Sequence, residues 1–383
     1  MKIAFFCDSY IPTRNGVAIS ASSTARVLRE MGHQVVIFAP RYPGYEDHDP
    51  DIVRFAASPY YRVRDFPVTW PVLPYISWPG FLRFKQEKFD VVHTHSPFIL
   101  GTVGAHWAQH FEIPVVFTFH TLYHRYIHYA PFPETVSRPY TLRKVRKYCT
   151  YCDHIIAPSH AIERLVHRFN NHVPTDVIPT GVELARFRNG DRQAARREYG
   201  IDTDAKVLLY VGRLAPEKNL DFMLSSLEPV LKADPKLRLL LVGGGPLLEP
   251  LKVLCGELGL EGKVLFSGFV DPAKLKDIYA AGDAFVFASR TETQGVCITE
   301  AMAAGLPCVV VGAMGAAEAL DDGVEGFIVP PHQSRFAAAV NRLMSDDALR
   351  ARMAKAAETR SEDYSLRSSS ARILKIYESV VRF

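Results

Sequence analysis

The stretch VLLYVGRLAPEKNLDFMLSSLEPVLKADPKLRLLLVGGG, residues 207–245, contains an apolar run, a helix-length segment and a second apolar run. Neither apolar run shows the polar alternation of a half-exposed strand, so we predict strands that are covered on both faces. The segment between them is rich in Leu, Glu and Lys, as helical stretches are. A strand, a helix and a strand in this order predict neighbouring parallel strands of an α/β sheet.

The same alternation extends in both directions from this stretch. Downstream follow the apolar runs KVLFSGF, AFVFAS, CVVVG and GFIVP. Upstream lie KIAFFCDS, QVVIFAP, DVVHTHS, PVVFTFH, HIIAPS and DVIPTG, with a helix expected near residues 19–31. The prediction is an α/β protein with two Rossmann-like, doubly wound parallel sheets. Ligands of such sheets bind outside the carboxyl ends of the strands, so we expect the site in a cleft that both domains face.

Length and composition predict the domain organisation. The chain has 383 residues, more than the roughly 250–300 residues at which single hydrophobic cores stop growing. We expect one domain over residues 1–190, a second over 191–365 and a final helix over 366–383. The polar stretch 188–204, which contains an Asn-Gly-Asp turn, is the expected linker. The final helix has an apolar face that needs a partner, and the N-terminal domain is one candidate.

Composition excludes several classes of protein. No segment approaches the roughly 18 apolar residues of a membrane span, and the first strand reaches Asp8 too early for a signal peptide. We therefore expect a cytoplasmic protein. The six cysteines are scattered, and the lone CxxC at Cys149 and Cys152 has no second pair, so redox or zinc chemistry is disfavoured. A reducing compartment suits this cysteine usage.

Charge is distributed unevenly along the chain. Residues 1–190 carry 21 Lys and Arg against 15 Asp and Glu, whereas the remainder carries 24 against 26. A basic N-terminal half indicates an anionic partner on that side, but the excess is too small and diffuse to indicate nucleic acid. The oligomeric state is left open by the sequence.

Several strand ends in the second half carry side chains suited to a diphosphate. Arg213 and Lys218 follow the strand VLLYVG, where a guanidinium fork and a point charge lie near the start of a helix. The next strand ends in Gly243, Gly244 and Gly245, which permit close approach of the backbone to a ligand. That glycine run is equally compatible with a helix-entry turn.

The stretch Arg290 to Glu300, RTETQGVCITE, is the most informative in the sequence. It follows the strand AFVFAS and places Glu292 and Glu300 eight residues apart. If a helix begins near Gly295, Glu292 precedes its first turn and Glu300 lies one to two turns inside it. From spacing alone, an acidic loop followed by a solvated helical Glu is as good an interpretation as a ligand site.

These motifs together resemble glycosyltransferase family 4, whose members are retaining and have the GT-B fold. The resemblance rests on Glu292-x7-Glu300, on GR and EKN at residues 212–219, and on VGGGP at 242–246. It extends to VIPTGVELARF at 177–187, DVVHTHS at 90–96 and the glycine-bearing loop after the first strand, so it covers nearly the whole chain. The resemblance implies an acceptor-binding N-terminal domain and a C-terminal domain that binds the nucleotide-sugar donor.

The resemblance also implies roles for individual residues. The expected catalytic residues are His120, Glu292, Arg213 and Lys218. From the residues alone, a single His that closes a strand is more often structural, so the resemblance carries the assignment of His120. The expected donor-binding residues are Gly16, Arg213, Lys218, Gly244, Val270, Glu292, Thr293, Gln294, Gly295, Val296 and Glu300, with Glu300 on the ribose hydroxyls, Val270 near the base and Gly16 approaching the phosphate.

The expected chemistry needs a nucleotide sugar and no metal. No DxD pair lies in a plausible metal loop, and His93 and His95 alternate on one strand face without a third ligand. Arg213 and Lys218 would instead stabilise charge on the departing nucleoside diphosphate. Retention requires either a carboxylate nucleophile or front-face attack, and the resemblance favours front-face attack, with His120 beside the donor sugar.

The acceptor is expected from the N-terminal half. Residues 60–83 mix aromatic residues and prolines, and residues 138–147 hold five cations, a combination that suits an anionic membrane surface. A loop packed on the core with a solvated basic helix is the alternative. The residues expected at the membrane or acceptor are Trp70, Trp78, Arg143, Lys144, Arg146 and Lys147.

Within the family, TFHTLYHRYIHY at 118–129 and ETQG at 292–295 most resemble the bacterial diacylglycerol glucosyltransferases. The resemblance implies transfer of glucose from UDP-glucose to diacylglycerol by an enzyme peripheral on the inner face of the cell membrane. A soluble or polyprenyl-linked sugar acceptor, or a GDP-mannose donor, is the alternative within the fold. A sugar-nucleotide epimerase or a non-catalytic nucleotide-sugar binder is the alternative from another class. A dehydrogenase is disfavoured because no GxGxxG follows the first strand.

Overall fold

The computed structural model describes residues 1–13, 15–63, 66–69, 78–126, 133–170 and 172–381. The chain forms two compact units. The first unit comprises Met1–Gly181 together with Leu366–Phe383, and the second comprises Val182–Ser365. Among the described residues, no helix is both long enough and apolar enough to cross a membrane.

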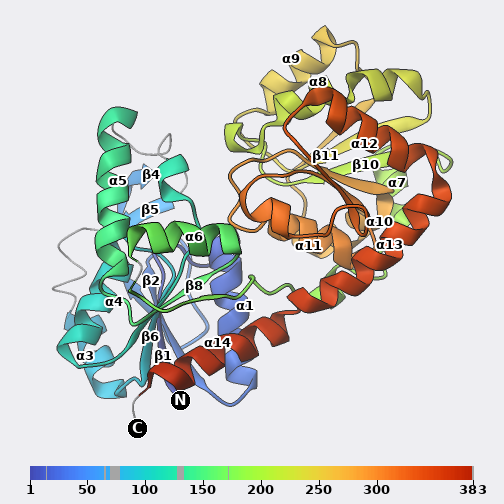
Figure 1. The fold of residues 1–383 in the computed structure, drawn as a ribbon. Helices are drawn as coiled ribbons and strands as arrows, with labels where there is room; N and C mark the ends of the chain where they lie inside the picture. The colour runs from blue at the N-terminus through green and yellow to red at the C-terminus, as the bar shows by residue number, and fades with distance from the viewer. Residues whose placement is uncertain (14, 64–65, 70–77, 127–132, 171, 382–383) are drawn as a thin grey trace. The chain divides into compact units, whose positions relative to one another are not determined.

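The first unit is built on a seven-stranded sheet of order β3-β2-β1-β6-β7-β8-β9, in which every pair of neighbours is parallel (Figure 1). The chain moves outward from β1 in one direction and then restarts beside it at β6, which makes the edge between β1 and β6 a switch point. A short antiparallel pair, β4 and β5, lies outside this sheet. The strands are β1 (Lys2–Phe6), β2 (Gln34–Pro40), β3 (Ile52–Phe55), β4 (Ala57–Val63), β5 (Phe66–Thr69), β6 (Val91–Thr94), β7 (Val115–Thr118), β8 (His154–Ala157) and β9 (Thr175–Val177).

Helices follow the strands of this unit, and the last helix of the chain belongs to it. Helix α14 lies beside α1 in Figure 1, and its Ile373 and Tyr377 are buried in a core shared with β1, β2 and β6. The apolar face expected for the final helix therefore packs within the first unit. The helices are α1 (Gly16–Glu30), α3 (Trp78–Glu87), α4 (Ile99–His110), α5 (Glu134–Cys149), α6 (His160–Phe169) and α14 (Leu366–Val380), with a short 3-10 helix η1 (Tyr123–Arg125).

The second unit repeats this architecture with six parallel strands in the order β12-β11-β10-β13-β14-β15. Its switch point lies between β10 and β13. The strands are β10 (Lys206–Val211), β11 (Leu237–Val242), β12 (Val264–Gly268), β13 (Ala284–Phe287), β14 (Cys308–Val311) and β15 (Gly326–Val329). The helices are α7 (Arg192–Glu198), α8 (Leu220–Ala233), α9 (Leu248–Glu257), α10 (Leu275–Ala281), α11 (Val296–Ala303), α12 (Gln333–Ser345) and α13 (Asp347–Ser361).

The central strands of the second unit are apolar because both faces are covered. Leu208, Leu209 and Tyr210 of β10 are each fully buried, and they belong to one core with the inner faces of α8 and α11. An uninterrupted apolar strand is stable only between two such layers. The doubly wound parallel sheets expected from the sequence are thus confirmed in both halves of the chain.

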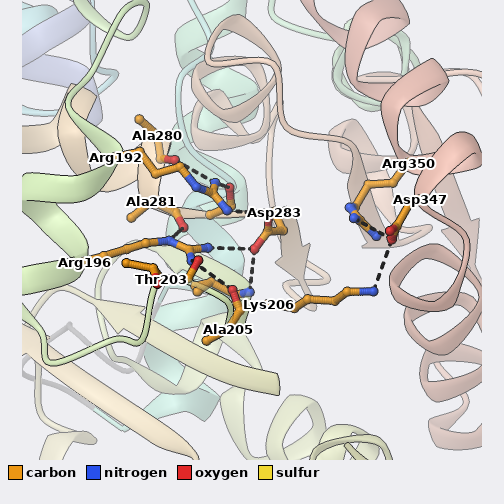
Figure 2. A network of polar contacts seen from close by, with 12 residues as sticks. Arg192, Arg196, Thr203, Ala205, Lys206, Ala280, Ala281, Asp283, Asp347 and Arg350 are labelled. Carbon is orange, nitrogen blue, oxygen red and sulfur yellow. Dashed lines mark hydrogen bonds and ion pairs between the residues drawn. The ribbon is translucent and has the colours of Figure 1, made fainter. Parts of the chain in front are cut away.

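The stretch expected as a linker is instead part of the second unit. Within residues 188–204 the chain forms α7, whose first turn is capped by Asp191, the side chain of which accepts from Ala194 N at 2.9 Å. Arg196 is 1% exposed and pairs with Asp283 at 3.0 Å (Figure 2). The prediction failed because the arginines of this polar stretch are used to bind an internal carboxylate, which composition does not reveal.

The division between the units falls before the boundary expected near residue 190. Val182, Leu184 and Phe187 are buried in the core of the second unit, and Val182 forms a parallel bridge with Ser365. The unit therefore begins at Val182. The chain enters the second unit at Val182 and leaves it after Ser365, and these two residues are paired in space although they are far apart in the sequence.

Candidate active site

Two loops meet at the switch point of the second unit. The loop after β10 carries Arg213 and Lys218, and the loop after β13 carries Glu292. The Lys218 ammonium lies 2.6 Å from the Glu292 carboxylate, and both side chains are largely buried. The same ammonium lies 5.8 Å from the centroid of the Phe287 ring, which favours a cation at this position. The structure thus brings together two of the expected catalytic side chains, while Arg213 is half-buried at the end of β10.

Hydrogen bonds join these two loops. The Ser289 hydroxyl donates to the Glu217 carbonyl at 3.0 Å, and the Asn219 amide donates to the Ala288 carbonyl at 3.1 Å. Asn219 has a φ of 58°, a left-handed conformation that asparagine tolerates better than most residues. Lys218, placed between these anchored residues, is held with its ammonium at the loop after β13.

The loop from Glu292 to Gly295 is fixed by backbone contacts with the segment after β14. The Gly315 N–H donates to the Glu292 carbonyl at 3.0 Å, and a Cβ on Gly315 would lie 2.0 Å from the Thr293 carbonyl oxygen. Gly295 precedes α11 with a φ of 86°, and Gln294 is buried. The helix considered as a possibility near Gly295 begins at Val296, so the first N–H groups of α11 lie at the end of this loop.

Glu300 lies inside α11 and is held by a tyrosine. The Tyr279 hydroxyl donates to Glu300 Oε2 at 2.7 Å, and the Tyr279 side chain is fully buried. Burial raises the pKa of Glu300 above its ordinary value, while the bond from Tyr279 and the charge of Arg186 oppose the shift. The solvated helical Glu considered as the alternative does not occur, because this carboxylate is half-buried and hydrogen-bonded.

The glycine run after β11 is required by close backbone packing. A Cβ on Gly243, whose φ is 128°, would lie 2.1 Å from the Gly212 carbonyl oxygen. A Cβ on Gly244 would lie 2.4 Å from the ring of Phe269, which is 89% exposed. Val270 follows that ring and is half-buried. The run therefore brings the loop after β11 close to the loops after β10 and β12.

Three histidine rings cluster at the carboxyl ends of β6 and β7 in the first unit. His95 Nδ1 lies 2.9 Å from His120 Nε2, and the two ring planes are nearly parallel, with centroids 5.2 Å apart and an interplanar angle of 19°. The His93 ring lies 4.3 Å from that of His95, and it contacts the hydroxyls of Thr118 and Tyr377 at 2.7 and 2.6 Å. Burial lowers the pKa of His93 to about 3 and that of His120 to about 4, so both rings are neutral at pH 7.

Gly16 begins α1 behind an asparagine cap. Asn15 Oδ1 accepts from Ala18 N at 2.8 Å, and Asn15 Nδ2 donates to Ser9 Oγ at 2.7 Å. Gly16 is exposed at the helix N-terminus, where free N–H groups favour an anion.

The residues expected at the membrane have different environments. Arg143, Arg146 and Lys147 are exposed on α5. Lys144 is half-buried, and its Nζ donates to Thr102 Oγ1 at 2.9 Å, so it is less exposed than the other three cations. Trp70 and the side chain of Trp78 lie outside the described residues.

A hollow in the second unit lies away from the switch-point loops, at the opposite ends of the strands. Among the described residues, no group of three His, Cys, Asp or Glu side chains could hold a metal ion. A hollow of about 430 Å³ is lined by Asp283, Leu306 and Arg350, among others. It lies at the amino ends of β13 and β14, whereas ligands of doubly wound sheets bind at the carboxyl ends.

Sequence reasoning missed several residues that hold the site together. Tyr279, Ser289 and Gly315 lie in different elements from the groups they fix, and nothing in their local sequence indicates these contacts. His95 had a signal, the alternation of two histidines at a strand end. That signal was interpreted only as a possible metal ligand.

Two doubly wound parallel sheets, one of which carries a lysine, two glutamates and a glycine run after its strands, are the architecture of the GT-B glycosyltransferases. The chain belongs to glycosyltransferase family 4 and is a retaining enzyme of that family. The family model "Glycosyltransferase Family 4" matches residues 14–186, and "Glycosyl transferases group 1" matches residues 191–360.

The relatives of this chain include two proteins named alpha-monoglucosyldiacylglycerol synthase. The alpha-monoglucosyldiacylglycerol synthase of Streptococcus pneumoniae is 32% identical over 324 residues, which cover 82% of this chain and 71% of that protein. The enzyme of the same name from Acholeplasma laidlawii is 29% identical, covering 81% and 80%. The D-inositol 3-phosphate glycosyltransferase of Nocardia farcinica is 28% identical, covering 96% and 85%.

Solved structures share the fold. Anabaena HepE in complex with UDP superposes with a TM-score of 0.80 at 21% identity, covering 99% of this chain and 100% of that chain. Sucrose-phosphate synthase from Thermosynechococcus elongatus superposes with a TM-score of 0.81 at 22% identity, covering 99% and 98%. The GT-B fold expected from the sequence is confirmed by these likenesses.

Proposed function

We propose that this enzyme transfers glucose from UDP-glucose to a lipid acceptor such as diacylglycerol at a membrane surface. The observation that carries the proposal is the relationship to the S. pneumoniae alpha-monoglucosyldiacylglycerol synthase, at 32% identity over 82% of this chain. The donor is supported by the structural neighbour HepE, which was solved with UDP and with UDP-glucose.

The donor would be bound by the switch-point loops of the second unit. Lys218 and Arg213 would bind the diphosphate, and Glu300, held by Tyr279 at 2.7 Å, would bind the ribose hydroxyls. The present partner of Lys218 is Glu292, so binding of a diphosphate would give the ammonium a second anion to contact. The cations of the protein would supply the charge stabilisation for which other transferases use a metal, so we propose that no metal is obligatory.

We propose front-face attack for the chemical step. The acceptor hydroxyl would form its bond to the anomeric carbon on the face from which the nucleoside diphosphate departs. The hydroxyl proton would pass to a phosphate oxygen of the leaving group, so no side chain needs to form a covalent bond. His120, neutral because burial lowers its pKa to about 4, would contact the donor sugar as a hydrogen-bonding group.

Helix α5 offers the surface for an anionic membrane. Val136 and Tyr140 are 58% and 66% exposed, and Arg143 and Lys147 follow them at helical spacing on the same face. Apolar side chains followed by cations along one helix face suit insertion at a lipid headgroup layer, where each cation contributes about 1 kcal/mol.

Transfer of labelled glucose from UDP-glucose to diacylglycerol in mixed micelles with anionic lipid tests the function. We expect labelled product in the organic phase. The double variant Arg143→Glu/Lys147→Glu should lose vesicle binding and most lipid transfer. Arg352→Glu/Lys355→Glu, at exposed positions of α13, changes the net charge equally and should lose neither.

A soluble acceptor is the second candidate, because D-inositol 3-phosphate glycosyltransferases match this chain over as much as 96% of its length. Absence of labelled lipid, with UDP or GDP still raising the melting temperature, would reject the lipid acceptor. Transfer to inositol phosphate in the aqueous phase would then support the second candidate, and a preference for GDP over UDP would redirect the choice of donor.

A further inference from the structure

In the buried pair of His95 and His120, the Nε2 atom of His95 restricts which ring nitrogens can carry protons. His95 is 2% exposed, and its Nε2 has no hydrogen-bond partner among the described residues. Its Nδ1 is the atom that lies 2.9 Å from His120 Nε2. Burial, with His93 and His120 beside it, keeps the pKa of His95 well below its usual range. Each ring is therefore neutral and carries a single N–H.

Only two proton arrangements make the contact between Nδ1 and Nε2 a hydrogen bond. In the first, His95 is protonated at Nδ1 and donates to the Nε2 lone pair of His120. In the second, His120 is protonated at Nε2 and donates to His95, whose own N–H must then lie on Nε2. The second arrangement buries an N–H group without an acceptor, which is unfavourable and rare in proteins. The first leaves only a lone pair unused.

We infer that His95 is a positioning residue which, by donating from Nδ1, fixes His120 as the neutral tautomer protonated at Nδ1. This inference rests on the proposed role of His120 beside the donor sugar. With its Nε2 lone pair occupied by His95, His120 has no basic nitrogen to offer and faces its other neighbours as an N–H donor. His120 therefore stabilises a sugar oxygen by donation, and the acceptor proton goes elsewhere.

The neighbourhood holds His95 in this role. The Phe5 ring packs against the His95 imidazole at 4.7 Å. The His93 ring lies 4.3 Å from that of His95 and is itself hydrogen-bonded to Tyr377 and Thr118. These two rings, which also contact each other at 5.1 Å, restrict the plane of the His95 imidazole and hence the direction of its Nδ1–H. The backbone supports the same placement, because the His95 N–H donates to the Phe6 carbonyl at 2.9 Å.

Nitrogen-15 NMR of the histidine rings in the full-length protein reads these tautomers directly, since protonated and unprotonated ring nitrogens resonate far apart. We expect both His95 and His120 to be protonated at Nδ1 near pH 7. His95→Phe keeps a ring of similar size without an N–H, and should release His120 to the other tautomer. His95→Asn carries an amide nitrogen at the same number of bonds from Cα as Nδ1, and should restore the tautomer.

Kinetics should follow the tautomer. His95→Phe should lower kcat about 10- to 100-fold, the loss typical when a group that orients a metal-binding histidine is removed, with little change in KM for the nucleotide sugar. His95→Asn should recover most of that loss. His93→Phe, the matched control, removes the neighbouring buried imidazole and should lower the melting temperature while His120 keeps its tautomer and kcat changes less than that of His95→Phe.

Protonation of wild-type His120 at Nε2, or a His95→Phe variant with unchanged tautomer and kcat, would overturn the inference. The NMR measurement needs no substrate, so it remains decisive if glucosyl transfer is never observed. Absent transfer together with Nδ1 protonation of His120 would reject the proposed function and leave the assignment of His95 intact.

Discussion

At the scale of single residues, the candidate site depends on charges that are partly removed from water. Lys218 and Glu292 are paired at 2.6 Å with most of each side chain covered, and Glu300 is held by Tyr279. In such surroundings an electrostatic contact is stronger than at an exposed surface. Substitutions that remove one of these charges should therefore have large effects on the rate of transfer or on the free energy of unfolding.

Lys218→Ala should slow transfer roughly 100- to 1000-fold, the usual consequence of losing one donor that stabilises developing charge. Initial rates with labelled UDP-glucose measure this effect, and the melting temperature shows that the variant folds. Lys232→Ala is the control, because Lys232 is exposed on α8 and pairs with Glu228 of the preceding turn. Near-normal turnover by Lys218→Ala would contradict the assigned role.

Glu300→Gln should change how stability depends on pH. Because the pKa of Glu300 is raised in the folded protein, the folded state holds this proton more tightly than the unfolded chain does. Its contribution to stability is complete below the ordinary Glu value of 4.5 and is lost as pH rises through the raised pKa. The non-titrating Gln should therefore gain stability relative to wild type across that window.

Urea unfolding of both proteins at a series of pH values measures this difference, and Asp8, whose pKa burial also raises, contributes equally to both. If the difference in unfolding free energy between the variant and wild type does not change above pH 4.5, the pKa of Glu300 is not raised in the folded protein. The same variant should bind UDP more weakly if Glu300 contacts the ribose.

At the scale of elements, the beginning of the second unit is held by a network around one carboxylate. Asp283 accepts from Arg192 at 2.6 Å, from Arg196 at 3.0 Å and from the Val207 N–H at 2.8 Å (Figure 2). These contacts join α7 to the amino ends of β10 and β13. Arg196 also donates to the carbonyl groups of residues 203 and 205.

Asp283→Asn should destabilise the second unit by about 3–5 kcal/mol, because it leaves the buried Arg196 guanidinium without its counter-charge. The free energy of unfolding in urea measures this loss. Asp347→Asn is the matched control in the same region of Figure 2, and it should have little effect because that carboxylate is 73% exposed. Equal effects of the two substitutions would show that burial does not govern this network.

At the scale of the whole molecule, chain order and spatial order differ. The first unit is completed by the last helix of the chain, since Ile373 and Tyr377 of α14 are buried against strands formed from the first hundred residues. The second unit is continuous between Val182 and Ser365. The integrity of the N-terminal sheet thus depends on the C-terminal helix.

Truncation after Ser365 should expose the core of the first unit and cost at least about 3 kcal/mol, the loss typical of removing one large buried side chain. Hydrogen exchange followed by mass spectrometry should show reduced protection of β1 and β6, with protection of β10 retained. Lys375→Ala, at an exposed position of α14, should leave both unchanged. Unchanged protection of β1 in the truncated chain would contradict the proposed dependence.

Local sequence was sufficient to predict the two parallel sheets, their central strands and the family. Strands buried on both faces must be continuously apolar, and ligand-binding groups must follow their carboxyl ends, so these features are written in local sequence. The sequence also indicated Glu292, Glu300 and Lys218 as members of one site.

The contacts between side chains of separate elements could not be predicted in this way. Four such contacts join residues from separate elements. They are the ion pair of Arg196 with Asp283, the hydrogen bond from Lys144 to Thr102, the hydrogen bond from Tyr279 to Glu300 and the contact of His95 with His120. Such contacts depend on the register and packing of neighbouring elements, and each strand or helix would form without them. The local sequence therefore indicates where the site lies, whereas the packing of the folded chain determines which ion pairs form there and which ring nitrogens carry protons.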